Sequence, residues 1–149
     1  MKRLLALLLS AALGLSFGLS GFSEDRSCYF NDEENHVYAS GPAESRKIAL
    51  TFDDGPHPYY TEQLLDGLAD RGVKATFFLL GENIEGREDV IRRMSEEGHL
   101  IGNHTFYHVD INSLSMEEAC AEIRDTSEAI RAITGQQVEY VRPPYGNWN

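Results

Sequence analysis

Strand signals and helix signals alternate along this chain from residue 47 to residue 141. Short apolar runs and segments with helical periodicity predict strands at 47–52, 75–80, 100–102 and 138–141, and helices at 61–71, 88–97 and 115–135. Strands that alternate with helices favour parallel pairing through right-handed crossovers. The sequence therefore predicts an α/β fold, and this pattern fits an open sheet and part of a barrel equally well.

Capping residues set the expected ends of the helices. We expect Thr61 to be the N-cap of the first helix and Gly72 to end it, because a hydroxyl caps free N–H groups and glycine tolerates the turn that follows a helix. Ser115 and Glu118 have the spacing of a capping box, which predicts the start of the third helix. Gly135 is expected to end that helix.

The first expected strand leads directly into two adjacent acids. Residues 48–52 predict a buried strand, and Gly55-Pro56 predicts the turn that ends it. Asp53 and Asp54 therefore stand at the carboxyl end of a strand, where α/β folds keep their chemistry. Because adjacent like charges repel, we expect a cation to hold them. A metal ion on one carboxylate would leave the other free to act as a base.

Two histidines follow the third expected strand at positions i and i+4, His104 and His108. Two imidazoles and one carboxylate form a credible set of metal ligands. Surface histidines at this spacing are also common without a metal. His57 and His99 lie near these motifs, and we interpret them as structural or rim residues.

Three segments follow the carboxyl ends of expected strands, at 53–58, 103–110 and 142–149. Parallel strands place these ends at one edge of the sheet, so we expect the three segments to meet. The third contains Arg142, which by itself could be a surface charge. Their convergence is a stronger indication of a site than any one motif.

The charge of the chain restricts its partners. The 149 residues include 24 acidic and 13 basic residues, for a net charge of −11. This balance argues against a nucleic-acid partner, which would require a basic face. The length is sufficient for one domain with a hydrophobic core.

Residues 1–23 are predicted to be a secretory signal peptide. Lys2 and Arg3 precede an uncharged, leucine-rich segment, and small residues suit cleavage after Ser20 or Ser23. The same segment is nearly long enough to be an uncleaved membrane anchor, although its glycine and serine content favours cleavage. We predict a secreted or cell-envelope protein that is attached to a membrane only if this segment is uncleaved.

Residues 24–46 are polar and are predicted to be a linker. The two cysteines of the chain are Cys28, in this linker, and Cys120, in a helical pattern. In an exported chain they could pair. The pattern around Cys120 favours a small core residue instead.

Three motifs in order resemble the polysaccharide deacetylase family, whose domain is also called the NodB homology domain (carbohydrate esterase family 4): Thr51-Phe52-Asp53-Asp54-Gly55-Pro56, His104-Thr105-Phe106-Tyr107-His108 and Arg142-Pro143-Pro144-Tyr145-Gly146. The resemblance implies a distorted (β/α) barrel, of which residues 47–149 would be the N-terminal portion. It also implies a hydrolase that removes acetyl groups from N-acetylglucosamine in peptidoglycan, chitin or related glycans.

The resemblance implies a role for each motif residue. Asp53 would be the catalytic base, Arg142 would pair with it, and the backbone N–H of Tyr145 would help to bind the oxyanion. Three side chains would hold a metal ion, usually zinc although some members use other divalent ions: Asp54, His104 and His108.

The resemblance also implies a difference. The family's domain continues past the third motif and includes a later histidine that protonates the leaving amine. No histidine follows His108 in this sequence, so we expect a C-terminally truncated chain without this general acid. The alternatives to a deacetylase are a non-catalytic product that binds metal or glycan, and an esterase that removes O-acetyl groups from xylan.

Overall fold

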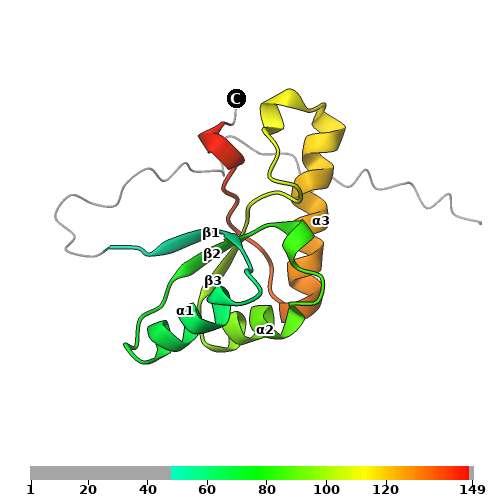
Figure 1. Ribbon diagram of the computed structural model, residues 1–149. Helices are drawn as coiled ribbons and strands as arrows, with labels where there is room; N and C mark the ends of the chain where they lie inside the picture. The colour runs from blue at the N-terminus through cyan, green and yellow to red at the C-terminus, as the bar shows by residue number, and fades with distance from the viewer. Residues whose placement is uncertain (1–47, 148–149) are drawn as a thin grey trace, which may run out of the picture.

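The computed structural model describes residues 48–147, which form a parallel sheet with helices packed against it (Figure 1). The predicted signal peptide, the linker, Cys28 and Trp148 lie outside these residues. The strands are β1 (Thr51–Gly55), β2 (Thr76–Leu79) and β3 (Leu100–Asn103). The α-helices are α1 (Tyr60–Ala69), α2 (Glu88–Glu96) and α3 (Met116–Thr134), and the 3-10 turns are η1 (Gly81–Asn83), η2 (Ile111–Ser113) and η3 (Pro144–Gly146).

The sheet confirms the predicted parallel α/β fold. β1 pairs with β2 and β2 with β3, both in parallel, in the order β1-β2-β3. The helices α1 and α2 contact each other, α2 contacts α3, and both α2 and α3 contact β3. In Figure 1 the segments that follow β3 and Val141 extend to the same side of the sheet. The arrangement is that of a partial barrel with its helices outside.

The core lies between the sheet and the helices. Phe77 and Leu79 of β2 are buried beside Leu65 of α1 and Ile91 of α2. Ile130 of α3 completes the same cluster. Each helix thus contributes its apolar face, as the periodicity predicts.

The first strand begins later than predicted. Ile48 is 87% exposed and Leu50 is 38% exposed, so the expectation of a buried strand over 48–52 is wrong. β1 is an edge strand of the sheet, and residues before Thr51 have a neighbouring strand on one side at most. β1 instead continues through Asp53 and Asp54, with an irregular register between Phe52 and Gly55.

The last predicted strand is reduced to a single bridge between Asn103 and Val141. Asn103 N–H donates to Tyr140 O at 2.9 Å, and Arg142 N–H donates to Asn103 O at 2.8 Å. Pro143 and the proline after it have no N–H to donate, so the ladder cannot continue. The bridge is nevertheless sufficient to bring Arg142 to the carboxyl end of β3.

The predicted caps have different outcomes. Ser115 and Glu118 form the capping box of α3, and Gly135 ends that helix with φ of 71°. Thr61 is not an N-cap, because α1 begins at Tyr60. The hydroxyl of Thr61 instead accepts a hydrogen bond from His57 N–H at 2.8 Å and so fixes the segment before the helix.

Cys120 is half-buried on α3 and is disulfide-bonded. It therefore does not pack as a free core thiol. Among residues 48–147, no helix combines the length and apolar character that a membrane crossing requires.

His99 lies buried at the start of β3 and is 3% exposed. Its Nδ1 accepts a hydrogen bond from Ala75 N–H at 3.1 Å, which ties β3 to the segment before β2. Burial is the main cause that lowers the pKa of His99, and Lys74 and Arg93 lower it further, against the opposing effect of Glu97. His99 is therefore structural and is held in its neutral form.

We predict that His99 makes the fold sensitive to acid. Its pKa is lower in the folded state than in the unfolded state, so unfolding takes up a proton below about pH 6.5 and stability falls as the pH drops. For one such group, the free energy of unfolding falls by up to about 1.4 kcal/mol for each pH unit. Denaturant unfolding of the wild type and of His99→Asn, which keeps an acceptor but cannot titrate, should show a shallower pH dependence in the variant between pH 7 and 5. Equal slopes would contradict this prediction.

Candidate metal and catalytic site

Three loops meet at the carboxyl ends of the strands, as the sequence predicts. β1 supplies Asp53 and Asp54, and the segment after β3 supplies His104 and His108. His104 N–H donates to Leu79 O at 2.9 Å, so this segment follows the end of β2. The bridge at Val141 brings the third segment, with Arg142, against the other side of β3.

Asp54, His104 and His108 form a group of three possible metal ligands. Asp54 Oδ1 lies 3.3 Å from His104 Nε2 and 3.4 Å from His108 Nε2. One ligand atom from each residue lies within 4.8 Å of the other two. One carboxylate and two imidazoles leave room for a further ligand, which is typical of catalytic zinc sites.

A hydrogen bond fixes the tautomer that suits His104 for metal binding. His104 is 4% exposed, and its Nδ1 lies 2.6 Å from the carbonyl oxygen of Arg142. Because a carbonyl only accepts, Nδ1 carries the proton and Nε2 keeps its lone pair on the side of Asp54. Histidines that bind metals commonly have such a partner on the second nitrogen. The donor set therefore fits zinc and several other divalent ions.

Asp53 has a different partner. Its Oδ1 accepts a hydrogen bond from Arg142 Nη1 at 2.6 Å, and the same Nη1 lies 3.0 Å from the hydroxyl of Thr51. The Arg142 guanidinium also lies over the ring of Phe78, 4.0 Å from its centroid. The side chains of Asp53 and Arg142 are each 37% exposed, so the pair orients the carboxylate more than it stabilises the fold.

Strained backbone is concentrated in these loops. Within the described residues, the non-glycine residues with positive φ are Asp54 (64°), Thr105 (70°), His108 (53°) and Tyr145 (60°). Such conformations cost about 1–3 kcal/mol each and cluster at functional sites. Asp54 has this conformation in the irregular part of β1, directly after Asp53. The two adjacent carboxylates therefore contact different partners. Asn83 supports this backbone by donating to Asp54 O at 3.0 Å.

Asn103 anchors the histidine loop to α3. Its side chain is fully buried and donates from Nδ2 to Ile123 O at 2.6 Å and to Ser127 Oγ at 2.8 Å. Its Oδ1 accepts from Thr105 N–H at 2.7 Å. The residue directly before His104 is thereby fixed on three sides.

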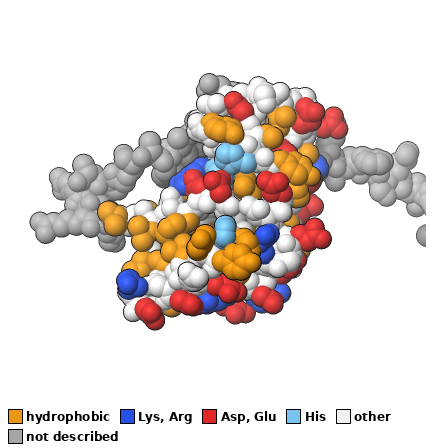
Figure 2. All heavy atoms as spheres, viewed as in Figure 1, with side chains coloured by type: hydrophobic (Ala, Val, Ile, Leu, Met, Phe, Trp, Pro, Cys, Tyr) orange, Lys and Arg blue, Asp and Glu red, His pale blue; other side chains and the backbone are white. Residues whose placement is uncertain are grey.

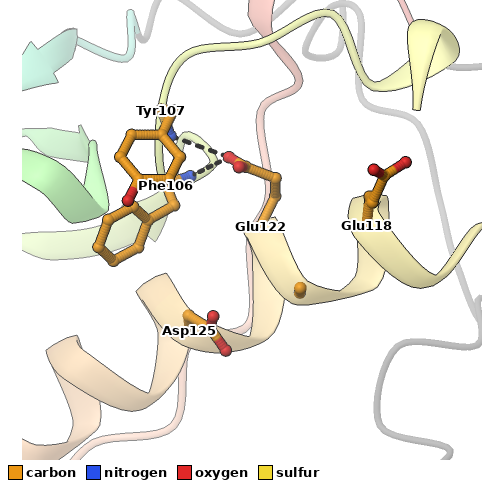
Figure 3. A pocket seen from close by; sticks show the side chains of 6 residues that line it. Phe106, Tyr107, Glu118, Glu122 and Asp125 are labelled. Atoms are coloured by element: carbon orange, nitrogen blue, oxygen red, sulfur yellow. Dashed lines mark hydrogen bonds between the residues drawn. The ribbon is translucent and has the colours of Figure 1, made fainter. Parts of the chain in front are cut away.

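Glu122 of α3 holds the middle of the same loop. One carboxylate oxygen accepts from Phe106 N–H at 2.8 Å and from Tyr107 N–H at 2.9 Å, and Figure 3 shows these two bonds beside a shallow pocket. Neither Asn103, on β3, nor Glu122, on α3, is predicted as a site residue from the sequence. A polar residue on a strand or helix has no local signal that indicates which loop it supports.

Gly81 allows the backbone of η1 to lie close to the loop that carries His104 and His108. Gly81 N–H donates to Thr105 O and Glu82 N–H donates to Phe106 O, both at 3.1 Å. A Cβ atom at Gly81 would lie 2.2 Å from Phe106 Cδ2 and 2.6 Å from Thr126 Oγ1. Only glycine therefore lets η1 pair with the loop in this way.

The third loop presents Tyr145 beside the histidines. Its ring centroid lies 5.0 Å from that of His108. Among the described residues, no backbone hydrogen bond engages Tyr145 N–H. Asn147 Nδ2 donates to Asp110 Oδ2 at 2.8 Å and ties this loop to the histidine loop.

The remaining histidines do not join the metal group. His99 is buried in the core, as described above. His57 lies in the first loop, and its Nδ1 accepts from Tyr59 N–H at 3.1 Å and Tyr60 N–H at 3.2 Å. Both have structural bonds, in agreement with their interpretation from the sequence.

A protein-family model for polysaccharide deacetylase matches residues 40–149. The chain therefore belongs to the polysaccharide deacetylase family. Its parallel α/β domain carries the possible metal site in the loops at the strand ends. The resemblance seen in the three motifs is confirmed.

Individual relatives agree with this assignment. The chain is 42% identical to a peptidoglycan-N-acetylglucosamine deacetylase of Bacillus cereus, over 83% of this chain and 46% of the relative. It is 45% identical to a chitooligosaccharide deacetylase of Rhizobium leguminosarum bv. trifolii, over 72% of this chain and 50% of the relative. The chain thus spans about half the length of these curated relatives.

Solved structures show the same fold. The crystal structure of the Bc1960 peptidoglycan N-acetylglucosamine deacetylase superimposes with a TM-score of 0.71 at 41% identity, covering 73% of this chain and 51% of that one. The chitin deacetylase of Colletotrichum lindemuthianum gives a TM-score of 0.65 at 45% identity, covering 68% and 46%. These matches confirm the fold class predicted from the sequence.

We predict that Asp53 and Asp54 differ in their effect on metal binding. Asp54→Asn, His104→Ala and His108→Ala should each lose measurable zinc affinity, because each removes one of three ligands. Asp53→Asn should bind zinc as the wild type does. Competition titration against a zinc-sensitive dye measures both effects. Loss of zinc in Asp53→Asn and its retention in Asp54→Asn would reverse the assignment of base and ligand.

We also predict that Gly81→Ala displaces the histidine loop. The added methyl group overlaps Phe106, which should cost about 1–3 kcal/mol of unfolding free energy and weaken zinc binding. Gly67→Ala in α1 is the matched control, since its Cβ would meet only Arg71 Nη1 at 3.5 Å. That variant should gain about 0.5–1 kcal/mol and leave zinc affinity unchanged. Denaturant unfolding and zinc titration of both variants test the prediction, and equal behaviour would contradict it.

Proposed function

We propose that this protein is a metal-dependent hydrolase that removes acetyl groups from polysaccharides containing N-acetylglucosamine, such as peptidoglycan or a chitin-like glycan. One observation carries the proposal: two adjacent carboxylates have separate partners. Asp54 lies with two histidine nitrogens, and Asp53 lies with Arg142. The names of the deacetylase relatives support the same reaction and substrate class.

The side chains divide the reaction between them. An amide is unreactive, so its carbonyl must be polarised and water must be activated. A divalent ion, zinc in this proposal, would supply the Lewis acid for both when held by Asp54, His104 and His108. Asp53 would take the proton from the attacking water.

Two further groups would support this step. Arg142 orients the Asp53 carboxylate through a charge-assisted hydrogen bond. The free N–H of Tyr145 would donate to the acetyl oxygen as that oxygen becomes negative, and loss of such a donor costs about 100- to 1,000-fold in rate. No donor for the leaving amine is assigned among residues 48–147.

A second candidate substrate is an O-acetylated xylan. One structural relative is the Xyl-CE4 domain of a multidomain xylanase, with a TM-score of 0.65 and 39% identity over 68% of this chain. The same residues would act on an ester, whose alkoxide leaving group depends less on a positioned acid. A binding-only protein is the third outcome that the experiment below distinguishes.

We further propose that the protein acts outside the cytoplasm, on an extracellular or cell-envelope glycan. The charged start and leucine-rich run of residues 1–23 support export. The acidic net charge argues against a nucleic acid as partner.

Acetate release tests the proposed reaction. The purified chain with zinc should release acetate from acetylated chitooligosaccharides or peptidoglycan, and a chelator should abolish the release. Asp53→Asn should lower the rate by about 100-fold or more while zinc stays bound, because it removes the base. Faster release from acetylxylan would favour the esterase. Absence of acetate from any substrate, with zinc bound, would contradict the enzymatic proposal and leave a binding role.

A further inference from the structure

Three exposed aromatic side chains lie where the first loop leads into α1. We call these residues, His57, Tyr59 and Tyr60, the aromatic platform. Tyr59 is 72% exposed and Tyr60 is 67% exposed. Exposed clusters of large aromatic side chains are typical of binding sites. The metal site and the Asp53–Arg142 pair do not use these residues.

Hydrogen bonds hold the backbone of the aromatic platform and the ring of His57 in place. The rings of His57 and Tyr60 stack with centroids 4.5 Å apart and an interplanar angle of 26°. The N–H groups of both tyrosines donate to His57 Nδ1, and His57 N–H donates to the buried hydroxyl of Thr61. A surface held in place in this way loses little entropy on binding.

The hydrogen bonds to His57 also determine what its ring presents outward. Since Nδ1 accepts from two N–H groups, the proton of the neutral ring is on Nε2. No described residue bonds to Nε2, so this N–H is available to a ligand oxygen. The platform thus combines aromatic rings with one oriented donor.

The platform lies close to Asp54 of the proposed metal site. Three peptide units separate His57 from Asp54, so their Cα atoms are at most about 11 Å apart. Figure 2 shows histidine atoms at two places on one face, with acidic side chains between them and hydrophobic side chains beside both. A glycan held at the metal site would therefore reach the platform with a neighbouring sugar unit.

The groove beside the platform is polar and mainly acidic. It is lined by His57, Pro58, Glu62, Glu85, Glu88 and Arg87, among others. Carboxylates accept hydrogen bonds from hydroxyl groups and repel anionic lipid surfaces, and they are depleted in the centres of protein interfaces. A pyranose ring fits both parts of this surface, because its C–H face is apolar and its edge carries hydroxyl groups.

We propose that the aromatic platform is a subsite for a sugar unit next to the one that is deacetylated. This inference rests on the proposed glycan substrate. A pyranose ring stacks on Tyr59 or Tyr60, and His57 Nε2–H donates to a hydroxyl or acetamido oxygen of the same unit. The carboxylates of the acidic groove accept hydrogen bonds from the remaining hydroxyl groups. The subsite makes the protein select chains over single sugars.

Binding of N-acetylglucosamine oligomers of increasing length tests the subsite. All proteins carry Asp53→Asn and bound zinc, so that no substrate is consumed, and isothermal titration calorimetry gives the Kd. The protein with an intact platform should bind the hexamer more tightly than the monomer. Tyr59→Ala with Tyr60→Ala should weaken hexamer binding by about tenfold and change monomer binding little.

Matched variants separate stacking from folding. Tyr59→Phe with Tyr60→Phe keeps the rings and should retain hexamer binding within about twofold of the intact platform. Leu100→Ala removes an exposed apolar side chain at the opposite end of a strand and should bind as the intact protein does. Circular dichroism melts confirm that each variant is folded.

Each result has a distinct meaning. If the intact platform binds longer oligomers better and the alanine variant does too, the subsite is wrong although the glycan proposal stands. If no oligomer binds while zinc is bound, both the proposed function and the subsite fail. If the alanine variant changes the oligomeric state in light scattering, the platform is a contact between copies of the chain and the subsite is overturned.

Discussion

The mutual repulsion of two neighbouring carboxylates is the constraint on which this site depends. Asp53 and Asp54 share the end of β1, and an irregular register with a positive φ at Asp54 separates their partners. Asp53 is paired with a guanidinium, and Asp54 lies with two imidazole nitrogens. A single strand end thereby presents two neighbouring carboxylates with different partners.

The two histidines of the possible metal site depend on support from elements far along the chain. α3 fixes their loop through Asn103 and Glu122, and η1 approaches it through the backbone of Gly81. These contacts fix the loop although Thr105 and His108 have strained backbone. The carbonyl of Arg142 orients the ring of His104, so the residue that pairs with Asp53 also positions one member of the possible metal site. Arg142 therefore contacts both parts of the site, Asp53 through its side chain and His104 through its backbone carbonyl.

The sequence was sufficient for the pattern of the fold and less so for its edges. Strand and helix alternation predicted the parallel sheet, and Ser115 and Gly135 marked α3 correctly. Apolar residues at 48–50 were mistaken for a buried strand because periodicity does not report whether a neighbouring strand is present. The predicted strand over 138–141 became one bridge at Val141, and the prolines that follow prevent the ladder from continuing beyond Arg142.

The sequence by itself determined which chemical groups this protein brings together. Two acids after an apolar run, two histidines four residues apart and an arginine before two prolines specify a family and a donor set. Only the tertiary structure decided which atoms meet: that Asp53 faces Arg142, that His104 keeps Nε2 free, and that Asn103 and Glu122 of distant segments hold the loop. The physical reason is that the local sequence sets backbone preferences and charge. Hydrogen-bond partners separated by 15 to 89 residues are fixed only when the sheet and helices pack.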